Sequence, residues 1–117
     1  MISLDFRKYI GKPHSEYDCY GLFRAIQADF GIDLPSFEPN DDRLAVSEQI
    51  DMEKLARYKR LKEPELLCAV VMYDAGVPSH IACYIGDGKI IHSTSARGVT
   101  IDDLDMSKVE GFYGVRQ

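Results

Sequence analysis

Apolar residues in the N-terminal third of the chain recur at helical spacing. Between residues 19 and 30 they fall on one face of a helix: Leu22, Phe23, Ile26 and Phe30. Gly31 follows, at the position where glycine commonly ends a helix. Residues 3–10 mix apolar and charged positions in a similar way and are closed by Gly11. We therefore predict a short amphipathic helix over residues 3–10 and a longer helix over residues 19–30.

The second half of the chain has the pattern of β-strands. Residues 66–73 are continuously apolar, which is typical of a strand buried on both faces. Gly86-Asp87-Gly88 separates two further apolar stretches and is a strong hairpin signal. The predicted strands are residues 66–73, 81–85, 89–93, 99–101 and 112–116.

Between these two halves the chain is rich in proline and acidic residues. Residues 32–41 are predicted to form a loop, after which Asp41 or Asp42 caps a polar helix that runs to about residue 61. Helices followed by a meander of antiparallel strands define the α+β class, with N-terminal helices packed on an antiparallel β-sheet. A length of 117 residues fits one domain, so residues 1–117 are expected to fold as a single unit.

Composition and charge narrow the possible partners. A formal net charge of -5 argues against a nucleic acid or an anionic membrane bound through a basic face. Residues 1–10 lack the apolar run of a signal peptide, and no stretch of about 18 apolar residues could span a membrane. Three cysteines without a CxxC pair leave at least one thiol free and indicate neither a disulfide framework nor a zinc knuckle. A reduced, thiol-dependent protein is the simplest interpretation.

Cys19 stands at the predicted start of the longer helix, directly after Asp18. Asp18 is expected to cap the helix with its side chain turned toward the backbone, while unpaired N–H groups and the positive dipole end face the thiol. Those features favour thiolate over thiol. Gly21 within the first turn costs roughly 1 kcal/mol relative to alanine, which indicates either close approach by another group or simple tolerance near a helix end.

Cysteine catalysis needs a thiolate, a base that activates it and a group that orients the base. Cys19, His80 and His92 can supply these three, with the backbone N–H of Cys19 as a donor to the oxyanion. A strict two-residue turn at Asp87-Gly88 would place the two histidines on opposite faces of the hairpin. Direct apposition of His80 and His92 therefore requires an odd-numbered loop or a bulge, which we predict near residues 86–89.

Other interpretations of these residues stay open. A zinc site built from Cys19, His80, His92 and a fourth ligand is conceivable by residue type, although metal ligands usually come with close spacing that is absent here. Each histidine can instead be a satisfied core or surface group. The other two cysteines, Cys68 and Cys83, lie in apolar strands and are interpreted as core filling.

Two aromatic or basic side chains near Cys19 are candidates for substrate contact. Tyr17 precedes the predicted helix cap and can line a pocket beside the thiol, or it can be an ordinary packed aromatic. His14 follows a turn proline, where a histidine is either exposed or part of a substrate pocket.

The chain resembles the NlpC/P60 family of papain-like cysteine peptidases, especially the compact versions in phage tail assemblies. An Asp-Cys-X-Gly-Leu block is followed by a histidine-led strand, a Gly-Asp-Gly-Lys turn and a second histidine. The similar blocks, in order, are residues 11–13, 17–22, 31–35, 79–92 and 113–116. The resemblance implies a papain-like fold in which a cysteine-bearing helix packs on an antiparallel sheet. It also implies that Cys19 is the nucleophile, His80 the base and His92 the orienting residue.

The same resemblance implies the substrate. Such enzymes cut amide bonds in peptidoglycan stem peptides, often beside D-glutamate and a diamino acid, without a metal or organic cofactor. This chain departs from the family pattern at Tyr20, at His14 and at Cys68-Ala69, where Gly-Asp is common. These departures concern the pocket rather than the three catalytic candidates.

We therefore expect a cysteine endopeptidase of bacterial cell wall, made in the bacterial cytoplasm or carried by a virion tail, with phage tail proteins as partners. The missing signal peptide fits delivery by such a machine. One alternative is a thiol amidase or acyltransferase that acts on another amide or ester. Another is a tail structural or wall-binding module that keeps the fold and hydrolyses nothing.

Overall fold

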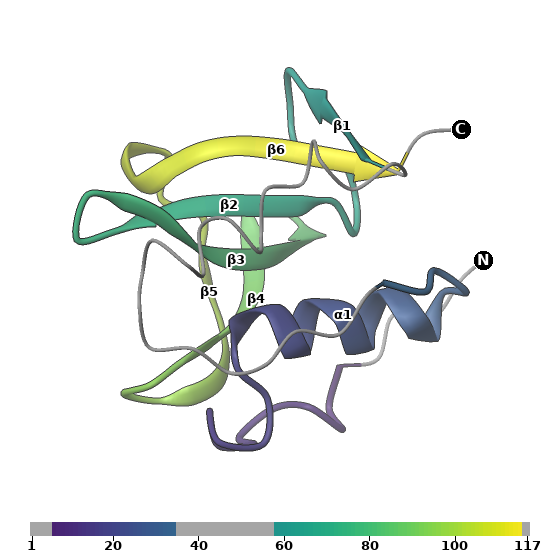
Figure 1. Ribbon diagram of the computed structural model, residues 1–117, viewed down its shortest axis with the longest axis vertical. Helices are drawn as coiled ribbons and strands as arrows, with labels where there is room; N and C mark the ends of the chain where they lie inside the picture. Colours follow the sequence, from purple (N-terminus) through teal and green to yellow (C-terminus); the bar gives the residue numbers. More distant parts are fainter. Residues whose placement is uncertain (1–5, 35–57, 116–117) are drawn as a thin grey trace.

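The computed structural model describes residues 6–34 and 58–115, and Figure 1 shows one helix lying beside a strongly twisted sheet. The elements are α1 (Cys19–Asp29), β1 (Tyr58–Leu61), β2 (Ala69–Asp74), β3 (Val77–Gly86), β4 (Lys89–Thr94), β5 (Gly98–Asp103), the 3₁₀ turn η2 (Met106–Lys108) and β6 (Val109–Val115). The α+β class predicted from the sequence is confirmed.

The six strands form one sheet in the order β1-β6-β2-β3-β4-β5. Every pairing is antiparallel. Strands β2 to β5 follow one another as a meander, and the C-terminal strand β6 returns to lie between β1 and β2.

Helix α1 forms where the apolar periodicity predicts it. Asp18 is its N-cap, and the Oδ1 atom of Asp18 accepts a hydrogen bond of 2.6 Å from the N–H of Gly21. At the other end, Ile32 donates to the carbonyl of Gln27 and Gly31 has φ +82°, as expected of a glycine that ends a helix. The helix buries four apolar or aromatic side chains and one glutamine: Tyr20, Leu22, Phe23, Ile26 and Gln27.

Alternation along the strands divides the buried residues into two layers. The layer that includes α1 also contains Val71, Ile81, Cys83 and Ile91 from the central strands. The opposite layer contains Val70, Met72, Ala82 and Ile90 from the same strands, with Cys68 before β2 and Phe112 from β6. Because β2 and β3 contribute to both layers, the continuous apolar run that predicted a doubly buried strand is explained.

The β3–β4 hairpin contains the irregularity that the two histidines require. Cys83 pairs with Ile91 and Tyr84 with Ile90, but Gly86 pairs with Lys89, so the register shifts between Tyr84 and Gly86. The extra residue lies in β3, at the edge of the predicted range. It restores the parity that a strict two-residue turn would lose.

Direct apposition of the two histidines is a prediction that the structure corrects. His80 precedes the last pair of this hairpin, Cys83 with Ile91, by three residues, and His92 follows it by one. The two therefore project to the same face of the sheet but are offset along the strands. Their contact is diagonal.

Two predicted helices are wrong within the described residues. Residues 7–11 form hydrogen-bonded turns, in which Tyr9 and Ile10 both donate to the carbonyl of Phe6, and no helix begins there. Residues 58–61 are strand β1 rather than the end of a helix, because they pair with β6. The remainder of that predicted helix, most of the predicted loop 32–41 and residues 3–5 lie outside the described residues.

The predicted strands are confirmed with shifted ends. The first of them begins at Ala69 rather than Leu66, because Leu67 has a positive φ of 67° and breaks the extended run. The others lengthen to β3, β4, β5 and β6 as given above. Among the described residues, no helix has both the length and the apolar character needed to cross a membrane.

Candidate active site

Cys19 is the first residue of α1, and the helix start is held against the sheet from two directions. The Oγ atom of Ser93, in β4, donates a hydrogen bond of 2.5 Å to the carbonyl of Tyr17. The thiol of Cys19 itself interacts with the backbone N–H of Ile81, in β3. The nucleophile candidate is thereby fixed beside the strand that begins with Val77 and carries His80.

The pKa of the Cys19 thiol is raised from its ordinary value, chiefly because the surrounding protein desolvates the sulfur. The charge of Asp18 raises it further, whereas the N–H groups of Ile81, Tyr20 and Cys19 lower it. The sequence argument counted the N–H groups at the helix start but left burial of the sulfur out. Its expectation that the resting protein favours thiolate is therefore wrong, and a base must remove the proton as the sulfur reacts.

His80 and His92 are in hydrogen-bond contact. The Nε2 atom of His80 lies 2.8 Å from the Nδ1 atom of His92, and the rings meet edge to face with centroids 5.0 Å apart. His92 is buried, with 9% of its surface exposed, and His80 is half-buried. The structure thus brings together the two histidines that the sequence pairs as base and orienting residue.

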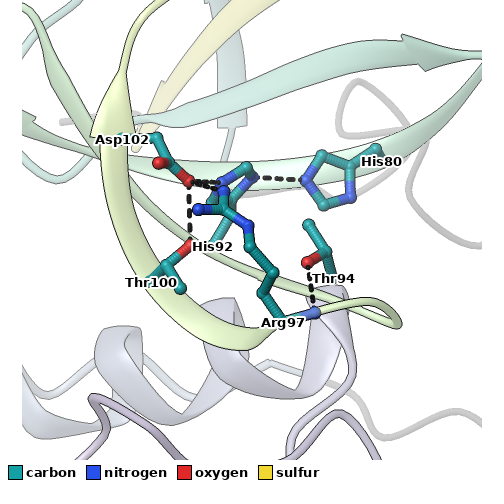
Figure 2. A network of polar contacts seen from close by, with 6 residues as sticks. All are labelled: His80, His92, Thr94, Arg97, Thr100 and Asp102. Carbon is teal, nitrogen blue, oxygen red and sulfur yellow. Dashed lines mark hydrogen bonds and ion pairs between the residues drawn. The ribbon is translucent and has the colours of Figure 1, made fainter.

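The row of polar contacts continues to a residue that the sequence analysis missed. The Nε2 atom of His92 lies 2.7 Å from Oδ2 of Asp102, in β5, as Figure 2 shows. The same oxygen accepts hydrogen bonds from Arg97 at 2.5 Å and from Thr100 at 2.8 Å. The one signal in the sequence was the spacing of two between Thr100 and Asp102, which places both on one face of a strand.

The pKa of Asp102 is lowered to about 2, first by the hydrogen bond from His92 and then by those from Thr100 and Arg97. Asp102 is therefore ionised at neutral pH. The pKa of His80 is lowered to about 4, mainly because burial disfavours its charged form and then because of nearby His92. His80 is therefore neutral at pH 7, as a base must be.

No hydrogen bond joins the thiol of Cys19 to the ring of His80 among the described residues. The contact between α1 and β3 at the site is made through the backbone: the sulfur of Cys19 meets the N–H of Ile81, the residue that follows His80. In the part of the chain that the structure describes, no three His, Cys, Asp or Glu side chains are grouped so that they could hold a metal ion.

The two substrate-contact candidates lie in the turn before α1. Tyr17 packs edge to face on Tyr9, with ring centroids 5.4 Å apart, and joins the apolar layer around the helix. Its side chain therefore packs on the turns that precede α1. His14 is half-buried, and its charge contributes to lowering the pKa of His80, so it lies near the base.

Cys68 and Cys83 are buried free thiols, with 3% and 1% of their surfaces exposed. Burial raises the pKa of Cys68 to about 11 and raises that of Cys83 as well. Their interpretation as core-filling residues is confirmed. Of these three cysteines, Cys19 is the one that is only partly buried.

Fold and site together define a class of small α+β proteins in which a helix that begins with cysteine packs on an antiparallel sheet carrying two hydrogen-bonded histidines. The chain belongs to the NlpC/P60 family, whose model matches residues 7–114.

Two curated relatives are similar to the chain. The tail tip assembly protein K of Escherichia phage lambda is 31% identical over 87 residues, which cover 68% of this chain and 42% of that protein. The gamma-DL-glutamyl hydrolase of Bacillus subtilis (strain 168) is 31% identical over 102 residues, which cover 86% of this chain and 23% of that protein. The chain spans less than half the length of each relative. The family and the second relative support a hydrolase role.

Proposed function

We propose that residues 1–117 are a single catalytic domain, a cysteine peptidase that hydrolyses an amide bond in peptidoglycan stem peptides. The observation that carries the proposal is the 2.8 Å contact between His80 and His92, made beside a thiol at a helix start. A neutral, half-buried imidazole ordered by a second one is the arrangement that general-base activation of a thiol needs. Membership of the NlpC/P60 family supports the same assignment.

In the proposed reaction, His80 takes the proton from the Cys19 thiol as the sulfur attacks the scissile carbonyl carbon. The carbonyl electrons move to oxygen, and the backbone N–H of Cys19 donates to that oxyanion. The C–N bond then breaks, and the leaving amine takes the proton from His80. Water attacks the resulting thioester, gives its proton to His80 and releases the acid, after which the thiolate is protonated again.

The bond proposed is one on the γ-carboxyl side of D-glutamate or next to the diamino acid that follows it. The name of the Bacillus subtilis relative, a gamma-DL-glutamyl hydrolase, supports a glutamyl substrate. His14 lies near His80 and is proposed as a substrate contact, and Tyr17 as part of the pocket wall. No metal or organic cofactor enters this chemistry.

The phage tail is the proposed place of action. The lambda relative is a tail tip assembly protein, which supports tail proteins as partners and delivery to the cell wall by a virion. The same observation favours a second candidate: a tail module that keeps the fold and hydrolyses nothing. A thiol amidase or acyltransferase that acts on another substrate is the enzymatic alternative.

The test is to incubate the purified chain with muropeptides of several wall types and to analyse the products by mass spectrometry. We expect new fragments whose summed mass exceeds that of the intact muropeptide by one water, and we expect no such fragments with Cys19→Ala. Cys68→Ala is the matched control, because it removes a buried thiol away from α1 and should retain cleavage. If neither the parent nor the control cleaves any wall type, the non-catalytic tail module becomes the better proposal.

A further inference from the structure

Asp102 ends the row of side chains that begins at His80, and its side-chain hydrogen bonds with the described residues all fall on one oxygen. Oδ2 accepts from His92 Nε2 at 2.7 Å, from Arg97 Nη2 at 2.5 Å and from Thr100 Oγ1 at 2.8 Å. Figure 2 shows the three donors converging on this atom from β4, from the β4–β5 turn and from β5. An oxygen held by a guanidinium and a hydroxyl stays an acceptor toward the third partner.

The direction of the hydrogen bonds then follows atom by atom. Since Oδ2 only accepts, Nε2 of His92 carries a proton, and in the tautomer whose single proton is on Nε2, Nδ1 of His92 has a lone pair. The Nε2 atom of His80, 2.8 Å away, must therefore donate to it. This leaves Nδ1 of His80 unprotonated and available.

We infer that Asp102 is a positioning residue of the active site, which fixes the tautomers of His92 and His80 so that Nδ1 of His80 is the base. The inference rests on the proposed function for the reaction, but its geometry stands on the contacts above. When Nδ1 of His80 takes the proton from Cys19, the imidazolium keeps its Nε2–H bond to His92, and no proton passes to His92 or Asp102. The carboxylate supplies the negative end of the row that a His–His pair alone lacks.

The groups that face His80 from other elements do not replace this role. His92 is its hydrogen-bond partner, while Asp74 in β2 and His14 before α1 act on it through charge alone, in opposite directions. Neither of those two groups specifies which ring nitrogen carries the proton. The one described group that makes the tautomer definite is the acceptor at Asp102.

The experiment is ¹⁵N–¹H spectroscopy of the histidine rings at pH 7, which is tractable because the chain has 3 histidines. We expect the parent to show protonated Nε2 and bare Nδ1 on both His80 and His92. Asp102→Ala removes the acceptor, so a second tautomer with Nδ1–H on His92 should appear. Asp103→Ala is the matched control: the neighbouring carboxylate is exposed and pairs with Lys89, so both tautomers should match those of the parent.

A second variant keeps the test informative if Asp102→Ala does not fold. Asp102→Asn can present a carbonyl oxygen to the same three donors, so the tautomers should be retained without the negative charge. With a cleavable muropeptide, kcat should fall about 10- to 100-fold in Asp102→Ala, less in Asp102→Asn, and KM should change little. Protonated Nδ1 on His92 in the parent, or unchanged tautomers in Asp102→Ala, would overturn the inference. A parent that shows the expected tautomers but cleaves nothing would instead remove the proposed function.

Discussion

The Oδ1 atom of Asp18 accepts a hydrogen bond from the N–H of Gly21 at 2.6 Å, and a Cβ added to Gly21 would lie 2.8 Å from that same oxygen. Glycine at this position is therefore explained by the cap itself. The sequence analysis expected another backbone or a ligand to approach Gly21 closely, or mere tolerance near a helix end. The group that approaches is instead a side chain three residues earlier.

Replacing Asp18 by asparagine separates its two effects on the site. Asparagine caps helices about as well as aspartate, so the hydrogen bond to Gly21 should survive. The negative charge that raises the pKa of Cys19 is lost, so that pKa should fall and more thiolate should be present at pH 8. We expect faster alkylation of Cys19 by iodoacetamide, followed by mass spectrometry of the Cys19 peptide.

Asp18→Ala is the control for this prediction, because it removes the charge and the cap together. It should lower the free energy of unfolding by about 1 kcal/mol, whereas Asp18→Asn should not. An unchanged alkylation rate in Asp18→Asn would show that the charge of Asp18 does not reach the sulfur.

The N-terminal segment is held to the sheet at Gly98, where a second prediction arises. Gly11 donates to the carbonyl of Val99 at 3.0 Å, and Val99 donates to the carbonyl of Lys12 at 2.9 Å. Gly98 has φ +69°, and a Cβ there would lie 2.4 Å from that Lys12 carbonyl oxygen. Gly98→Ala should therefore push the segment that leads to Cys19 away from β5.

Gly88→Ala is a matched control for Gly98→Ala. Gly88 has φ +70° but no atom within 4 Å of an added Cβ, so its substitution carries the backbone penalty alone, about 1–2 kcal/mol. In urea unfolding, we expect Gly98→Ala to be less stable than Gly88→Ala by a further 1–3 kcal/mol or so. Equal losses in the two variants would mean that the contact with Lys12 relaxes freely.

Local sequence signals predicted the elements that depend on local pattern. Helix α1 has its periodicity, its cap and its closing glycine within a single stretch, and the β3–β4 hairpin is signalled by its glycines. The pairing of His80 with His92 was a hypothesis from residue type, and it predicted an irregularity in that hairpin, because a strict two-residue turn would place the two rings on opposite faces. These parts of the site could be predicted from the sequence.

Pairings between distant segments were not accessible in the same way. Strand β1 exists because residues 58–61 pair with β6, more than 50 residues later, and its own sequence was compatible with a helix. Asp102 reaches His92 only in the register of β4 and β5, which pairs His92 with Thr100. The raised pKa of Cys19 likewise depends on how tightly the helix start packs on β3, which no local motif encodes.

Ser93 ties the residue before the helix cap to the sheet, and its removal gives a third prediction. Its hydroxyl is 1% exposed and donates to the carbonyl of Tyr17 at 2.5 Å. Ser93→Ala would leave that carbonyl without its partner, at a cost of about 1–3 kcal/mol in the free energy of unfolding. Ser95→Ala, on the exposed β4–β5 turn, is the control and should change stability by less than about 0.5 kcal/mol. A loss in Ser93→Ala no greater than that of the control would assign the contact no energetic role.

The last prediction concerns acid and His80. The pKa of His80 falls from 6.5 to about 4 in the folded protein, so between these pH values the unfolded chain binds a proton that the folded protein does not. Stability should therefore fall as the pH drops from about 6.5 to 4, by roughly 3 kcal/mol from this group. Asp102 affects stability at lower pH. Its pKa is lowered to about 2, so its contribution to stability is complete above pH 3.8, the ordinary pKa of the group, and is lost as the pH falls from there toward 2.

Urea titrations at several pH values between 4 and 7 measure this effect, and His80→Gln should flatten the decline because glutamine does not titrate. His14→Gln should reduce the decline without abolishing it, since the charge of His14 helps to lower the pKa of His80. The acid-dependent loss of stability should therefore be smaller in His14→Gln than in the unsubstituted protein and smaller still in His80→Gln. A general loss of packing would not produce this order. If His80→Gln loses stability toward acid as steeply as the parent, another group must account for the decline, and the neutral state of the base at pH 7 would need a different explanation.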